Sequence, residues 1–132
     1  MSLSRRQRFP RSRRSVPAAR RFTGATLAEW GRTEREYDIR LCVSELVTNA
    51  LLHGVPPGRE MCVSLTADDE VLRVEVRDSG DGDPQVRHLS AEECTGRGLW
   101  VVRELADDFG VSEHVVGKTV WAVFKVSPPL GQ

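Results

Sequence analysis

Apolar residues between positions 39 and 51 recur at spacings of three and four, which places them along one face of a helix. A capping box at residues 33–36 predicts where this helix begins, and Gly54 followed by two prolines predicts where it ends. Capping and stop signals predict two further helices, over about residues 16–30 and 99–107.

Elsewhere apolar and polar residues alternate, which is the period of a strand with one buried face. The expected strands cover about residues 7–10, 61–66, 72–77, 109–115 and 119–126, the first being a short edge strand that ends at a proline. Residues 79–95 are polar and irregular, so we expect a long loop there that acts as a lid. The element order β-α-α-β-β-α-β-β predicts an α+β fold, a two-layer α/β sandwich whose mixed, mostly antiparallel sheet carries its helices on one face.

The length of 132 residues suits a single domain, and the composition is that of an ordinary globular protein. The net charge of zero hides an uneven distribution, because residues 1–21 contain eight arginines and no acid. We therefore expect a basic, flexible arm at about residues 1–14. The run lacks the interleaved aromatic side chains that stack on bases, so a nucleic-acid interface is the least favoured function.

The sequence also bears on the cellular compartment. It contains no run of about 18 apolar residues and no apolar stretch of the kind found in a signal peptide. The three cysteines are odd in number and widely spaced, which predicts neither a disulfide framework nor a Cys-x-x-Cys metal site. These features predict a cytoplasmic protein that does not associate with membranes.

Glu45 and Asn49 are the most informative polar residues, because they lie one turn apart on the longest predicted helix and share a face. An amide oxygen is a ligand that magnesium accepts, and a carboxylate beside it can take a proton from an attacking hydroxyl. The alternative is that both residues only face solvent. His53, one further turn along, is better explained as a helix-end residue than as a catalyst.

Two glycine-containing motifs follow. Asp78-x-Gly80-x-Gly82 comes directly after a predicted strand and offers an acceptor for an adenine amino group beside unobstructed backbone, although a lone aspartate there is usually a turn former. Gly96-Arg97-Gly98-Leu99 opens the last helix, where free N–H groups favour phosphate; Arg97 either pairs with phosphate or faces solvent. Taken in order, the motifs predict a site for ATP and Mg²⁺.

Residues 117–119 read Gly-Lys-Thr and look like the end of a Walker A motif. That motif would require a glycine at position 112, where Ser112 stands, and a helix after Thr119, where an alternating strand is expected. The Walker interpretation is therefore rejected.

The ordered motifs, with Thr119 in the closing strand, resemble the GHKL (Bergerat-fold) ATP-binding domain over about residues 9–126, and residues 45–54 are similar to anti-sigma factor serine kinases. The resemblance implies that Asn49 binds magnesium, Glu45 is the catalytic carboxylate, and Asp78 contacts adenine. It also implies that Gly80, Gly82, Gly96 and Gly98 shape the pocket and its lid, and that Thr119 lies near Asp78. Arg97 and Leu99, which belong to the second glycine motif, are expected to bind ATP as well.

Members of this type bind a sigma factor and phosphorylate a serine of a small antagonist protein, usually as homodimers. The resemblance thus implies a serine/threonine kinase and anti-sigma factor. Many superfamily members carry a lysine where this chain has Leu52, which favours the alternative of a non-enzymatic, nucleotide-gated binding module.

Overall fold

The computed structural model describes residues 2–53, 58–78, 97–113 and 117–127. The elements follow the predicted order: β1 (Leu3–Pro10), α1 (Ser15–Trp30), α2 (Glu36–His53), β2 (Glu60–Ala67), β3 (Val71–Asp78), α4 (Arg97–Leu105), β4 (Asp108–Glu113) and β5 (Lys118–Lys125). The expected lid over residues 79–95 lies outside the described residues.

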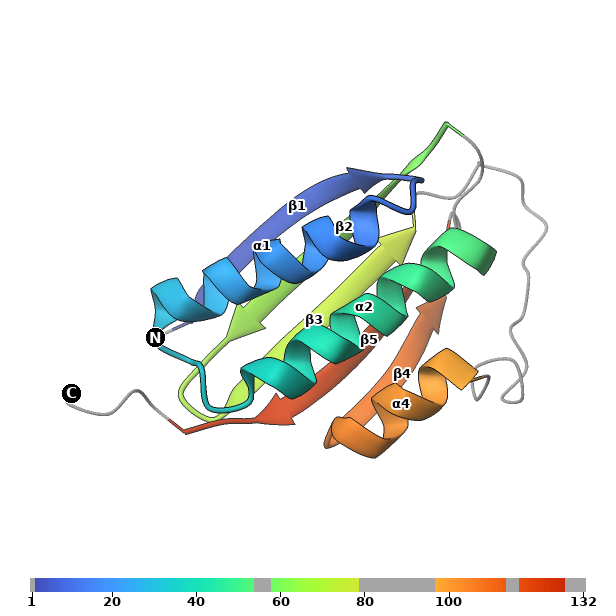
Figure 1. Ribbon diagram of the computed structural model, residues 1–132. Helices are drawn as coiled ribbons and strands as arrows, with labels where there is room; N and C mark the ends of the chain where they lie inside the picture. Colours follow the sequence, from blue (N-terminus) through green and yellow to red (C-terminus); the bar gives the residue numbers. More distant parts are fainter. Residues whose placement is uncertain (1, 54–57, 79–96, 114–116, 128–132) are drawn as a thin grey trace.

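The strands form one sheet in the order β1-β2-β3-β5-β4, and every described pairing is antiparallel. The three described helices cover one face of this sheet (Figure 1). The predicted two-layer α+β sandwich is therefore confirmed, with an antiparallel sheet in place of the expected mixed one. In the described ranges, no helix has both the length and the apolar character needed to span a membrane.

The expectation of a flexible basic arm at residues 1–14 is wrong for most of that segment. β1 starts at Leu3, not at position 7, and pairs with β2 in continuous register from Leu3 opposite Ala67 to Pro10 opposite Glu60. The arginines of β1 do not alternate with apolar residues, so the sequence pattern did not indicate a strand over residues 3–6. An edge strand can nevertheless carry charged side chains on the side that faces solvent. Phe9 is buried and meets the Phe22 ring edge-on at 6.0 Å between centroids, which anchors the strand under α1.

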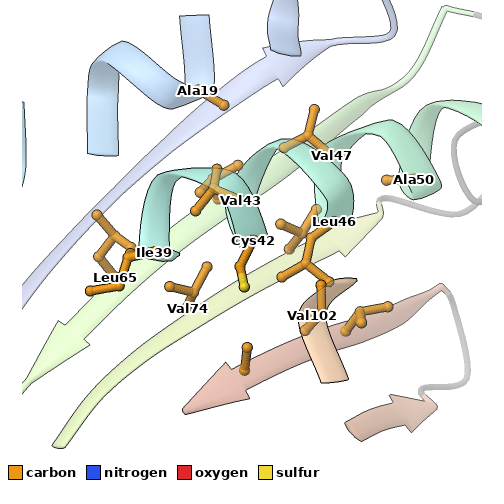
Figure 2. Close-up of a cluster of buried hydrophobic side chains, with 14 of the residues drawn as sticks. Ala19, Ile39, Cys42, Val43, Leu46, Val47, Ala50, Leu65, Val74 and Val102 are labelled. Carbon is orange, nitrogen blue, oxygen red and sulfur yellow. The ribbon is translucent and has the colours of Figure 1, made fainter. Parts of the chain in front are cut away.

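The core lies between the helices and the sheet. Figure 2 shows side chains of α2 pointing toward the sheet, with Leu46 close to Val102 of α4. The buried stripe of α2 is the one predicted from its spacing, apart from half-buried Leu51: Ile39, Cys42, Val43, Leu46, Val47 and Ala50. Burial also raises the pKa of the Cys42 thiol to about 12, so this cysteine is a packing residue rather than a reactive one.

Arg35 joins the start of α2 to two distant elements. Its guanidinium donates to the Leu105 carbonyl at 2.8 Å, pairs with the Asp107 carboxylate at 2.5 Å and stacks over the Phe124 ring at 5.0 Å. Asp107 also accepts the Lys125 N–H at 2.6 Å. The Lys125 N–H and then Arg35 hold the pKa of Asp107 below its usual range.

Replacing Asp107 by Asn should therefore lower the free energy of unfolding in a pH-dependent way. A depressed folded pKa means that the carboxylate stabilises the protein above its unfolded pKa of about 3.9 and loses this effect as pH falls through the folded pKa. The Asp107 side chain is 35% exposed, so screening limits the loss at neutral pH to about 1 kcal/mol.

Urea unfolding at neutral pH and at a pH below the folded pKa would measure this difference. Glu104→Gln, which changes an exposed acid near the end of α4, is the matched control. An equal deficit for Asp107→Asn at both pH values would contradict the assignment.

Candidate functional site

Glu45 and Asn49 are positioned by the packing of α2, which lies between α1 and α4 and above β3. Both residues are half-buried at the edge of the apolar stripe. The hydroxyls of Ser44 and Thr48 donate to helix carbonyls one turn earlier, at 3.1 Å and 2.8 Å. These polar neighbours are therefore satisfied within the helix, whereas Glu45 and Asn49 remain available to a ligand.

The Asn49 amide carries the clearest sign of a missing partner. Its Nδ2 atom is buried and has no hydrogen-bond partner among the residues that the structure describes. An unsatisfied buried donor costs about 1–3 kcal/mol, so it needs a specific explanation. A nucleotide phosphate would supply the missing acceptor, and the same amide has an oxygen that a cation can use.

Across the described parts of the chain, no three His, Cys, Asp or Glu side chains are grouped so as to hold a metal ion. Magnesium typically takes only one or two protein ligands and completes its shell with water and substrate phosphates. The amide oxygen of Asn49 fits that type of ligand set, with the Glu45 carboxylate one helical turn away.

Asp78 ends β3 and is 4% exposed. It lies opposite buried Met61, so its side chain is on the helix-covered face of the sheet. Its Oδ1 atom accepts the backbone N–H of Lys118 at 3.1 Å. This contact orients the carboxylate at the end of the sheet where the adenine contact was predicted.

The strand register separates Thr119 from Asp78. Thr119 lies opposite Arg77, while Val120, Ala122 and Phe124 of the same strand point into the core. Alternation therefore places the Thr119 side chain on the face of the sheet opposite Asp78.

Lys118 is a residue that the sequence analysis missed. Alternation puts its buried side chain on the Asp78 side, and its backbone already bonds Asp78. The available signal was the Gly-Lys-Thr segment, which was discarded with the Walker motif.

The N-terminus of α4 completes the described part of the site. Arg97 and Gly98 form its first turn, and Leu99 is buried in the core. Figure 1 shows this helix end, the C-terminal end of α2 and the end of β3 at the same end of the molecule. First-turn N–H groups have no partner within a helix and favour phosphate. The remaining predicted residues, Gly80, Gly82 and Gly96, lie outside the described residues.

Comparison with known protein families gives a match over most of the chain. Residues 9–124 match the family described as the histidine kinase-like ATPase domain. The chain belongs to this family. The predicted resemblance to GHKL proteins of the anti-sigma kinase type is thereby confirmed.

Its relatives include the anti-sigma F factors of Geobacillus stearothermophilus and Halalkalibacterium halodurans, both 30% identical to it. The first match covers 67% of this chain and 68% of the relative, and the second covers 78% and 79%. A crystal structure of the RsbU and RsbW domains of Rv1364c from Mycobacterium tuberculosis superposes with a TM-score of 0.72 at 20% identity. That match covers 96% of this chain but only 33% of the longer one, and it supports the fold alone.

We expect Asp78→Asn to remove nucleotide-dependent stabilisation without unfolding the protein. The amide oxygen of asparagine can still accept the Lys118 N–H, but its NH₂ group opposes an adenine amino group. Ligand at about a hundred times its Kd adds roughly 2.7 kcal/mol, which for a domain of this size raises the melting temperature by about 10 °C.

Thermal unfolding with and without ATP and Mg²⁺ would test this expectation. Glu75→Gln is the matched control, because Glu75 is on the same strand but on the other face, where it pairs with Arg73. A full ligand-induced rise in Asp78→Asn would remove Asp78 from the site.

Proposed function

We propose that this chain is an ATP- and magnesium-binding regulatory protein that acts as an anti-sigma factor and as a serine/threonine kinase. The single observation that carries the proposal is the buried, unpartnered amide of Asn49, one turn from Glu45. The alternative, that Glu45 and Asn49 only face solvent, does not explain why the Asn49 Nδ2 donor is buried without an acceptor.

Nucleotide binding would use the C-terminal end of α2, the end of β3 and the N-terminus of α4, which lie at the same end of the molecule. Asp78 would accept the adenine amino group, since its orientation is fixed from behind by Lys118. The α4 N-terminus would receive phosphate oxygens, and Asn49 Nδ2 would donate to one of them. These contacts would span the base and the phosphates of one ligand.

Phosphoryl transfer would depend on α2. When bound, magnesium would neutralise charge on the transferring phosphoryl group. Asn49 would hold the ion through its amide oxygen. The Glu45 carboxylate would orient the hydroxyl of the acceptor serine and take its proton, a role that nucleotide binding alone does not require.

The protein partners are proposed from the relatives. Those relatives are named anti-sigma F factors, and the family resemblance implies a sigma factor and a small antagonist protein as partners. On this proposal the antagonist is the phosphorylated protein, the chain acts in the cytoplasm, and it works as a homodimer.

The second candidate is a nucleotide-gated binding module without catalysis. It is favoured by Leu52, which is 70% exposed at the end of α2 where many superfamily members have a lysine. An exposed leucine cannot contact phosphate by charge, but it offers apolar surface to a partner protein. In this version ATP would change partner affinity and no phosphate would be transferred.

Glu45→Gln separates the two candidates. It should reduce transfer from labelled ATP to a candidate antagonist protein by about 100-fold or more, because a general base contributes at least that factor. Nucleotide affinity should change by less than about twofold, since the carboxylate has no assigned contact with the nucleotide. Glu36→Gln, in the first turn of the same helix, is the control and should keep full activity.

If the wild-type protein bound ATP, and bound its partner with an affinity that depends on ATP, without transferring phosphate, this result would favour the binding module. Equal transfer by wild type and Glu45→Gln would show that Glu45 is not the catalytic base.

A further inference from the structure

The face of the sheet away from the helices holds a second feature, a hollow of about 650 Å³ at the end of β1, β2 and β3. Four arginines contribute to its wall, and we call it the arginine basin. Its principal lining residues are Arg6, Arg8, Arg59, Arg77, Cys62 and Glu60. Gly58 also lines it, and no atom of a described residue lies within 4 Å of the position that a Cβ atom would take there, so the space beside Gly58 is open among the described residues.

Strand register brings these arginines together. Arg8 lies opposite Cys62, which lies opposite Arg77, so the three form one row across the sheet. Arg6 is two residues from Arg8 and therefore on the same face, about 6.8 Å further along β1. Half-buried Cys62 is at the floor of the row, between two exposed arginines.

The charge of the basin is not balanced by the described residues around it. None of its four arginines forms an ion pair or a side-chain hydrogen bond with a described residue. Glu75, the next acid on this face, is already bound by Arg73 at 2.6 Å. The Asp78 side chain lies on the other face of the sheet, where one of its carboxylate oxygens accepts the Lys118 N–H. The acid at the rim of the basin is therefore Glu60, which is exposed.

We propose that the arginine basin is the docking site for an acidic, extended segment of a protein partner. Carboxylates pair with arginine in a bidentate geometry. Alternate side chains of an extended peptide repeat at about 6.8 Å, the same spacing as Arg6 and Arg8. Such a segment could therefore present two carboxylates to β1 in register.

Two other occupants fit the basin less well. Single-stranded nucleic acid needs aromatic stacking surfaces, and no aromatic residue is among the described lining residues. Trp121, on the same face, already has Arg73 over its ring at 4.6 Å. A second copy packed face to face would set arginines against arginines, which like-charge repulsion disfavours.

The basin opens on the face of the sheet opposite the Asn49 site. Asp78 lines the hollow and is also assigned to ATP, but its side chain lies on the helix-covered face of the sheet, so the arginine side chains that would hold the acidic segment are separate from the ATP site. The proposal therefore goes beyond the kinase assignment and stands independently of it.

Fluorescence anisotropy with the full chain would test the proposal. The probe is a labelled peptide of alternating glutamate and threonine, compared with its glutamine–threonine counterpart. The double variant R8Q/R77Q should weaken binding of the glutamate peptide by about tenfold or more, because it removes both guanidinium groups of one row. The matched control R13Q/R20Q removes the same charge from exposed positions outside the basin and should change affinity by less than about twofold.

A second measurement locates the peptide. In a Cys94→Ser background, Cys62 is the accessible thiol, because Cys42 is buried. Bound glutamate peptide should slow the labelling of Cys62 by a neutral maleimide in the parent protein and not in R8Q/R77Q.

Three results would overturn the proposal. If both double variants lost the same affinity, the peptide would be attracted by the overall positive charge of the surface and not by the arginine basin. Tighter binding of an oligothymidine probe, with the same sensitivity to R8Q/R77Q, would make the basin a nucleic-acid site. Absence of peptide binding or of Cys62 protection would show that it is no docking site for acidic segments.

Discussion

Burial of one face of α2 against the sheet is the interaction on which the candidate site depends. Each fully buried Leu or Val of this stripe contributes about 1.5–3 kcal/mol, and six residues of α2 are buried in the core. An unsatisfied amide at Asn49 costs about 1–3 kcal/mol. Packing is therefore strong enough to hold Asn49 in a position that is unfavourable without a ligand, and Glu45 is fixed with it.

The sequence predicted the elements whose pattern is local. The stripe of α2 and the alternation in β2 and β3 predicted these elements to within a few residues, because a buried face imposes its period on the residues that form it. The start of β1 was not predictable in this way. Its arginines do not alternate with apolar residues, and its conformation is set by pairing with β2, more than 50 residues away in the sequence.

The same distinction holds for the candidate site. Glu45 and Asn49 are related by helical spacing within one element, so their common face could be predicted. That Lys118 rather than Thr119 shares a face with Asp78 follows from the alternation of buried residues within β3 and β5, and was open to prediction once both strands were expected. What the sequence did not specify is that β5 is the neighbour of β3, which brings the Lys118 N–H to a carboxylate 40 residues away.

β3 links the two surfaces of the molecule. Asp78 points to the helix-covered face and is assigned to the nucleotide, whereas Arg77, the preceding residue, faces the arginine basin on the other side. Strand alternation thus separates an acidic and a basic recognition site by a single peptide unit. On this account one protein can bind a nucleotide and an acidic partner segment at the same time, without competition for side chains.

The most direct measurement uses the fact that Asn49 is the only asparagine in the chain. Labelling asparagine with ¹⁵N in its side-chain amide gives a single ¹⁵N resonance, carrying two hydrogens, which reports on Nδ2 of Asn49. Adding ATP and Mg²⁺ should shift this signal strongly and slow the exchange of its hydrogens with water, because the unpartnered donor gains an acceptor. An unchanged signal in a protein shown to have bound ATP would contradict the account, since Asn49 would then lie outside the nucleotide site.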